Sequence, residues 1–257
     1  MKTMKKTTKT AKIKTINKHI SLILAVIMLL AVFAPLVSSF ADSADIVIKN
    51  EKDYLNLVKK CKTDTWSKGK TVTLANDIDL SKTDFSPIPT FGGHFDGKGY
   101  TISGIKINKK GSATGLFRYI QSGATVENLN VSGTVTPDGT QKNIGGIAGS
   151  LSGTLKNCTF SGNIKAKTNV GGIAGYVTET GVIDSCTFSG SVIATSYTGG
   201  IAGQNFGTIS NCENKGSINT KNTEESKTIQ DVDIDITNLR STENFEAATD
   251  TGGIAGY

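Results

Sequence analysis

Apolar positions along most of the chain fall in short clusters that recur with a fixed period. The pentapeptide Gly-Gly-Ile-Ala-Gly begins at residues 145, 171, 199 and 252, so three copies are closely spaced and an insertion precedes the fourth. A second cluster follows in phase in the segments TLKNCTFSGNI, VIDSCTFSGSV and TISNCENKGSI, and the earlier TVENLNVSGTV shares its spacing. Self-similarity with a period of about 20–50 residues indicates a solenoid.

The residue types within the repeats select the class of solenoid. Helical repeats need apolar residues three to four positions apart, and they tolerate Gly and Thr poorly. Here the clusters are short, rich in β-branched residues and separated by Gly, Asn and Ser, which is typical of strands joined by turns. We therefore predict an all-β fold, a parallel β-helix with three short strands per coil. Equivalent residues then lie about 4.8 Å apart, and a buried aliphatic ladder is expected from Ile147, Ile173, Ile201 and Ile254.

The same register places three of the four cysteines, Cys158, Cys186 and Cys212, over one another. Stacked neighbours would lie within the Cα separation of about 4.4–6.8 Å that disulfides use. Parallel residues in register direct their Cβ atoms the same way, however, so we predict a ladder of buried free thiols that pack as small hydrophobic groups. Disulfides between these cysteines, as an oxidising compartment allows, are the alternative.

The first 41 residues have a different pattern from the rest. They contain seven lysines and no acidic residue, then an apolar stretch from Ile20 to about Val37, and then Ser39-Phe40-Ala41. This order predicts a secretory signal peptide over residues 1–41, with an uncleaved membrane anchor as the alternative, since about 18 apolar residues can just cross a bilayer. We expect a secreted, extracellular protein, either free or associated with the cell surface, that meets a membrane only through the signal peptide during export.

Between the leader and the repeats, residues 42–110 are predicted to form an N-terminal cap and the first coils. A strand is expected at 46–48, a strand at 71–80 and a strand at 101–107. An amphipathic segment begins at Asn50 and Glu51 and has Tyr54, Val58 and Cys61 on one face, which predicts a short capping helix over the open end of the core.

Residues 111–257 carry the repeats, with a polar, acid-rich insertion at about 221–250. The sequence stops at Tyr257, directly after the fourth pentapeptide, so we expect a fragment of a longer protein. The formal net charge is +6. Because the leader holds seven of the basic residues, residues 42–257 have 21 Lys and Arg against 22 Asp and Glu. We therefore expect no nucleic-acid partner.

The repeats resemble those of the bacterial GLUG-motif proteins. Residues 199–212, GGIAGQNFGTISNC, are similar to the family repeat, and the stretch from NDIDL at Asn76 through FDGKGY and TISGI is similar to the opening coils that precede such repeats. The resemblance covers roughly residues 45–257. It implies a right-handed parallel β-helix on a secreted or surface-displayed bacterial protein, with relatives among adhesin-like proteins and the N-terminal regions of IgA-specific metallopeptidases.

Candidate chemical groups are few outside the leader. His94 is the one histidine there, so neither a pair of histidines for zinc nor a Ser-His-acid triad away from His94 is available. Asp77 and Asp79 are spaced to lie on one face of a strand and could hold a cation or act as acid and base, with Asp96 nearby. No acidic residue recurs at a fixed repeat position. We expect no catalytic, cofactor-binding or metal-binding residues, and no cofactor.

The insertion contains an alternation that is similar to the start of a calcium loop, at Asp231, Asp233 and Asp235. Ile236 replaces the glycine that such a loop requires, and Thr242 replaces its terminal glutamate. A solvent-facing strand edge is the simpler interpretation.

These observations favour a non-catalytic, exported β-helix that acts as a cell-surface adhesion, display or binding module. Its ligand would be a host or cell-surface protein or glycan, bound on a lateral face or at the insertion. One alternative is a carbohydrate-active β-helix enzyme, a polysaccharide lyase or hydrolase, with its site near Asp77, Asp79 and Asp96. Another is the stalk of a larger secreted peptidase.

Overall fold

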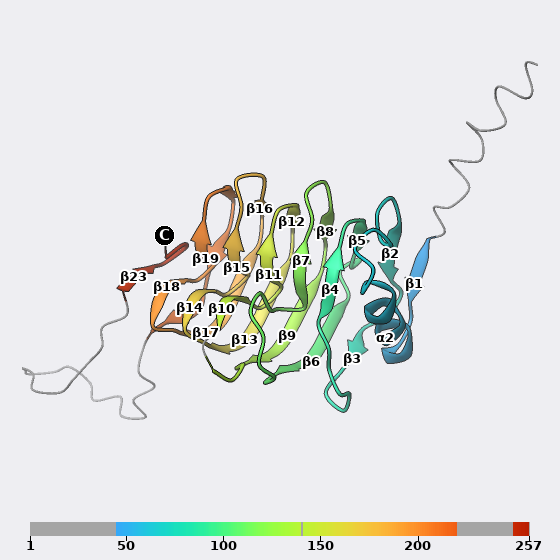
Figure 1. Ribbon diagram of the computed structural model, residues 1–257, viewed down its shortest axis with the longest axis horizontal. Helices are drawn as coiled ribbons and strands as arrows, with labels where there is room; N and C mark the ends of the chain where they lie inside the picture. The colour runs from blue at the N-terminus through green and yellow to red at the C-terminus, as the bar shows by residue number, and fades with distance from the viewer. Residues whose placement is uncertain (1–44, 140, 220–248, 257) are drawn as a thin grey trace, which may run out of the picture. The chain divides into compact units, whose positions relative to one another are not determined.

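The computed structural model describes residues 45–139, 141–219 and 249–256. The predicted signal peptide and the segment Asp231 to Asp235 lie outside these residues. Within them the chain forms a stack of coils made of parallel strands, with one short helix beside the first coils (Figure 1). The predicted all-β parallel β-helix is confirmed.

Four sheets run along the stack, and every strand pairs in parallel with its counterpart in the next coil. Sheet A contains β1 (Ile46–Ile48), β2 (Thr71–Leu74), β5 (His94–Asp96), β8 (Thr125–Glu127), β12 (Thr154–Lys156), β16 (Val182–Asp184) and β20 (Thr208–Ser210). Sheet B contains β3 (Ile78–Asp79), β6 (Thr101–Ile107), β9 (Asn130–Val135), β13 (Thr159–Lys165), β17 (Thr187–Ile193), β21 (Glu213–Asn214) and β22 (Ser217–Ile218).

Sheets C and D are shorter. Sheet C contains β4 (Ile88–Phe91), β7 (Phe117–Ile120), β11 (Ala148–Leu151), β15 (Ala174–Val177) and β19 (Ala202–Asn205). Sheet D contains β10 (Lys142–Gly145), β14 (Thr168–Gly171), β18 (Ser196–Gly199) and β23 (Thr249–Gly252).

Each repeat coil therefore has four strands, and the prediction of three was wrong. In the coil formed by β14 to β17, the pentapeptide ends one strand and begins the next, because the chain turns at Gly172 and Ile173. The predicted strand at 71–80 is likewise two strands, β2 and β3, in different sheets. Asn76 holds the inward position of that alternation but is exposed, and its Nδ2 donates to the carbonyl of Lys49 at 3.2 Å. The chain consequently turns there.

Identical positions stack in register through the core. Phe160 pairs with Phe188, and Leu155 pairs with Val126 on one side and Ile183 on the other. The aliphatic ladder is buried at Ile147, Ile173 and Ile201. The prediction was wrong at Ile254, whose side chain is 41% exposed. Ile254 is in the last coil that the structure describes, so described residues pack against it from one side.

The cysteine column is a ladder of free thiols, as predicted. Cys158 and Cys186 are buried and Cys212 is partly buried. The backbone N–H of Cys186 contacts Sγ of Cys212 at 3.4 Å, and each thiol lies within reach of a backbone carbonyl two residues before it in the chain. The column therefore contributes packing and weak hydrogen bonds to the corner between sheets A and B.

Helix α2 (Glu51–Lys60) covers the first coils and confirms the predicted cap. The side chain of Asn50 accepts a hydrogen bond from the Asp53 N–H at 3.1 Å, and Asp53 Oδ2 accepts from the Lys49 N–H at 3.0 Å. These two hydrogen bonds cap the N-terminus of the helix. Tyr54, Val58 and Cys61 are buried together. No helix in the described part of the chain is long and apolar enough to cross a membrane.

Candidate functional site

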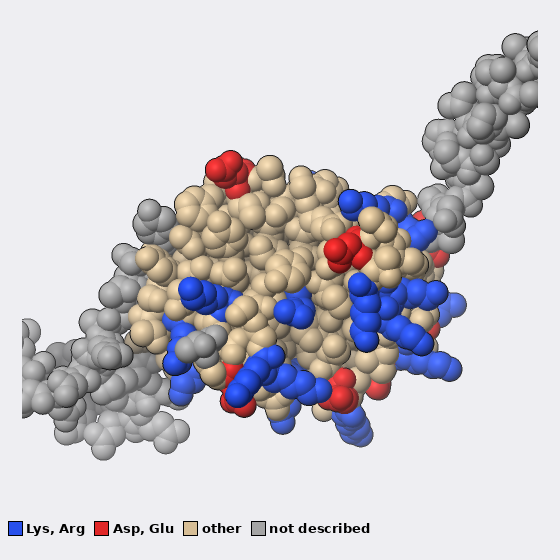
Figure 2. Space-filling model, viewed as in Figure 1, with Lys and Arg blue, Asp and Glu red and all other residues tan. Residues whose placement is uncertain are grey.

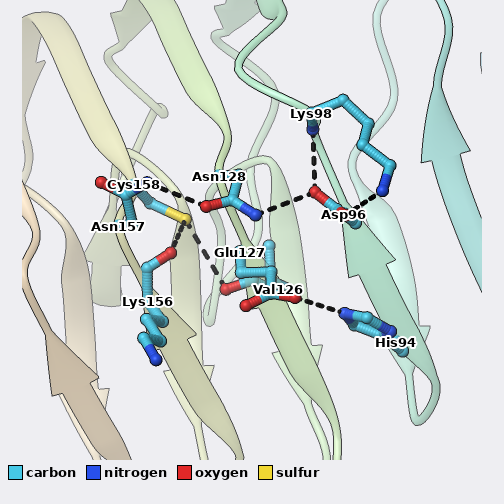
Figure 3. Close-up of polar contacts among 9 residues, drawn as sticks. All are labelled: His94, Asp96, Lys98, Val126, Glu127, Asn128, Lys156, Asn157 and Cys158. Carbon is cyan, nitrogen blue, oxygen red and sulfur yellow. Dashed lines mark hydrogen bonds and ion pairs between the residues drawn. The ribbon is translucent and has the colours of Figure 1, made fainter.

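His94 lies on β5 at the surface of sheet A, and its partner is an acid in the next coil. Its Nε2 is 2.7 Å from Oε1 of Glu127 on β8 (Figure 3). Thr71 and Thr125 flank His94 in the register of the sheet. Neither hydroxyl is hydrogen-bonded to the imidazole in the described structure, so the third member of a nucleophilic triad is missing there. The sequence did not single out Glu127, because the contact depends on the stacking of two coils.

Asp96 is the most enclosed of the candidate acids, and it supports a turn. Its Oδ1 accepts from the Lys98 N–H at 2.9 Å and from Nδ2 of Asn128 at 3.0 Å, and Oδ2 forms an ion pair with Lys98 Nζ at 2.8 Å (Figure 3). Burial by itself would raise the pKa of Asp96, but these hydrogen bonds from Lys98 and Asn128 together hold the pKa below its ordinary value. Lys98 has a left-handed backbone with φ of 53°, so Asp96 stabilises a turn that would otherwise be unfavourable.

The polar contacts continue from coil to coil along the same corner. Asn157 Nδ2 donates to Asn128 Oδ1 at 2.8 Å, and both asparagines have left-handed backbones (Figure 3). One coil beyond Asn157, Asp184 accepts from Ser210 Oγ at 2.7 Å and from Asn211 Nδ2 at 2.8 Å. These hydrogen bonds lower the pKa of Asp184. Asn tolerates this conformation and bonds to its neighbour in the next coil, so the corner ladder is structural.

Asp77 and Asp79 each hold a backbone amide at the surface. Asp77 Oδ1 accepts from the Thr101 N–H at 2.7 Å, and Asp79 Oδ1 accepts from the Ser81 N–H at 2.9 Å. Hydrogen bonds from Ser81 lower the pKa of Asp79. No described contact joins either acid to Asp96. Among the residues that the structure describes, no group of three or more His, Cys, Asp or Glu side chains could hold a metal ion.

A feature that the sequence analysis missed lies on the lateral face formed by sheet C. The rings of Tyr176 and Phe206 are 5.6 Å apart, and they line an open hollow of about 400 Å³ together with Thr178, Glu179 and Thr180. Tyr176 occupies an outward position of β15, in register with Gln204 of β19. The sequence carried a signal for Tyr176, which is two residues after the alanine of the pentapeptide, a position that points away from the core. It carried none for Phe206, which lies in the turn after β19.

A family model and two known proteins are similar to parts of this chain. The GLUG motif matches residues 140–165, 167–193 and 194–219. Halomucin from Haloquadratum walsbyi is 30% identical over 148 residues, which are 51% of this chain but only 2% of the length of halomucin. A crystal structure of a protein from Bacteroides ovatus, described as a candidate immunoglobulin A1 protease, superposes with a TM-score of 0.45 at 19% identity, over 70% of this chain and 79% of that one.

Proposed function

Because residues 140–219 consist of three GLUG repeats, we propose that the chain is an exported, non-catalytic β-helix that serves as a surface-exposed adhesion or display module. Export is supported by the lysine-rich, apolar and small-residue order of residues 1–41. The ligand would be a host or cell-surface protein or glycan that binds a lateral face of the solenoid.

One observation carries the non-catalytic part of the proposal. The candidate catalytic carboxylates hold the backbone in place: Asp77, Asp79 and Asp96 each accept a hydrogen bond from a backbone N–H. The pKa of Asp79 and that of Asp96 are lowered by such bonds. A general acid works best with a pKa near the operating pH, so carboxyl groups that are more acidic than usual suit this task poorly.

The lateral faces support the binding part of the proposal. The rings of Tyr176, which is half-buried, and Phe206, which is exposed, offer apolar area beside the carboxylate of Glu179 and the hydroxyls of Thr178 and Thr180. An apolar surface with a few convergent polar groups is the usual composition of a recognition site. Tyr176 lies on β15, and the other four residues lie in the turns that follow β15 and β19.

The test separates a module from an enzyme. A protein of residues 42–257 is incubated with acidic and neutral polysaccharides, with and without calcium, and new reducing ends and unsaturated products are measured. In parallel, its binding to arrayed glycans and extracellular proteins is recorded. We expect binding without turnover. Turnover that Asp79→Ala abolishes, while the matched exposed change Asp64→Ala does not, would establish the carbohydrate-active enzyme instead.

The export step has its own readout. The N-terminal residue of protein recovered from the culture medium or the cell surface is determined, and we expect Asp42. An intact Met1 on membrane-bound protein would support an uncleaved anchor and contradict the signal peptide.

A further inference from the structure

The first coils differ from the repeat coils in the connection from sheet B to sheet C. In the repeat coils, residues 166–173 and 194–201 make this connection and contain the sheet D strands β14 and β18. In the first coils, residues 80–87 and 108–116 make it, from β3 to β4 and from β6 to β7, without a named strand. These two segments, with residues of β6 and β7, line a hollow of about 150 Å³. Loops outside the regular strands are where binding groups can be carried.

Basic side chains dominate the charges around this hollow. It is lined by Lys106, Lys109, Lys110 and Arg118 and contains no acidic residue in its lining. Lys109 Nζ pairs with Asp84 Oδ1 at 2.7 Å, whereas Lys106 and Lys110 form no ion pair with any described residue. Two cations are therefore available to an anionic ligand.

The position of Arg118 is held by the loop beside it. Its Nε donates to the carbonyl of Ala113 at 3.3 Å, and its Nη2 donates to the carbonyl of Ser112 at 3.1 Å. The guanidinium is thus oriented before any ligand arrives, while its charge remains uncompensated by a carboxylate in the described structure. A pre-oriented cation loses little conformational entropy on binding.

The excess positive charge of the described solenoid lies in the first coils, which contain the hollow. Residues 45–118 contain thirteen Lys and Arg against eight Asp and Glu, whereas residues 119–219 contain five of each. Figure 2 shows the basic side chains gathered over the coils near β1 to β6, with few on the later coils. A long anionic ligand would therefore be attracted to the end of the solenoid that contains the hollow.

We propose that this hollow binds the anionic groups, carboxylate or sulfate, of an acidic polysaccharide. The proposal rests on the proposed function and names its ligand class. Phe85 and Ile107 line the hollow but are buried, at 5% exposure each, so a ligand there would meet mainly the basic side chains. Single-stranded nucleic acid would instead need exposed rings on which bases stack, and the ring of Phe85 is covered by Tyr54, with centroids 6.1 Å apart.

The experiment measures binding of residues 42–257 to polygalacturonate, dextran sulfate, uncharged dextran and single-stranded DNA by calorimetry at two salt concentrations. We expect binding to one or both acidic polysaccharides, weakened by salt, and none to dextran. Lys106→Gln and Lys110→Gln should each weaken binding about tenfold, in line with the loss of one charged hydrogen bond. The matched controls are Lys165→Gln and Lys167→Gln, exposed lysines of a later coil.

Each outcome decides the proposal. An equal loss in the control variants would show that binding follows net charge, and it would overturn the site. DNA that binds as tightly as the polysaccharides would overturn the ligand class, and absence of binding to both acidic polysaccharides would overturn both. Unfolding temperatures of the four variants show whether each remains folded. Failure of this test leaves the adhesion module standing if other glycans or proteins bind, whereas polysaccharide turnover would contradict the module itself.

Discussion

The ring of Phe188 occupies the space that any side chain at Gly172 would need. A Cβ atom on Gly172 would lie 2.3 Å from Cγ of Phe188 and 2.1 Å from the carbonyl oxygen of Gly200. The same ring stacks on Phe160, with centroids 6.3 Å apart and planes within 6°. Because the second glycine of the pentapeptide has no side chain, the stacked rings of Phe160 and Phe188 on sheet B can fill the space beside it. The two features that recur in the repeat, the double glycine and the Thr-Phe-Ser-Gly segment, therefore pack against each other.

Substitution of this glycine should be costly although it adds one carbon. Gly172→Ala forces a methyl group against a backbone oxygen that cannot move easily, and we expect it to lower the free energy of unfolding by about 1–3 kcal/mol. Gly111→Ala is the control, because a Cβ there would meet nothing within 4 Å. Denaturant unfolding measures both. Similar losses in the two variants would show that Gly172 does not pack against Phe188 as described.

The buried aliphatic ladder predicts a large difference between two substitutions in one coil. Ile173→Asp places an unpaired carboxylate among fully buried side chains, and we expect a loss of more than about 3 kcal/mol of unfolding free energy. Lys167→Ala, at an exposed position, should change it by less than about 0.5 kcal/mol. Thermal unfolding followed by far-ultraviolet circular dichroism compares them. Equal effects would mean that the register is wrong.

The thiol ladder should be unreactive in the folded protein and reactive after unfolding. The hydrogen bond with Cys158, together with burial, raises the pKa of Cys186 to about 12, and burial raises the pKa of Cys61 to about 12. The thiolate is the reactive form, so iodoacetamide at neutral pH should label neither cysteine natively. In denaturant without reductant, mass spectrometry should find Cys158, Cys186 and Cys212 alkylated. Protection of two of the three would demonstrate a disulfide.

The buried carboxylate of Asp96 should make stability depend on acid pH. Its pKa in the folded protein is lowered, so the unfolded chain takes up the proton first as the pH falls. The stabilisation is complete above the unfolded value of about 3.9 and is lost as the pH falls through the lower folded value. Asp96→Asn should cost about 1–2 kcal/mol at pH 7, because Lys98 and Asn128 lose a charged acceptor.

The pH dependence distinguishes this role from a general loss of packing. Unfolding free energies measured between pH 7 and pH 3 should fall more steeply for the natural protein than for Asp96→Asn. Asp64→Asn, at an exposed position, should follow the natural profile. Parallel profiles for the natural protein and Asp96→Asn would refute the assignment.

Much of the repeat region was predictable because stacking translates sequence period directly into contact. Once the segments around Cys158, Cys186 and Cys212 were aligned, the pairs Leu155–Ile183 and Phe160–Phe188 followed, and the structure has both. The capping helix was predictable from Asn50 and the apolar face of the segment after it. The number of strands per coil was not, because periodicity shows which residues are equivalent but not where the backbone turns within a coil.

The candidate site was much less predictable. The pairing of His94 with Glu127 joins residues 33 positions apart, in two successive coils that precede the matched GLUG repeats. The spacing of Asp77 and Asp79 predicted one face of a strand. Both acids are exposed, but Asp77 precedes β3 (Ile78–Asp79), and the backbone amides that these acids bind come from the folding of the following turn and coil. The basic hollow arises from two irregular loops for which no period predicts a common position.

By itself the sequence determined the stacking axis of this protein: its period, the residues that lie over one another, and the glycines and asparagines that turn the chain. Each of these depends on local conformation or on repetition, both of which are written along the chain. Only the tertiary structure decided which acids became anchors for turns, which lysines came to surround a hollow, and which aromatic rings met on the lateral face. Those depend on how neighbouring coils and irregular loops close in space, where residues distant in sequence compete for the same hydrogen-bond donors and the same volume.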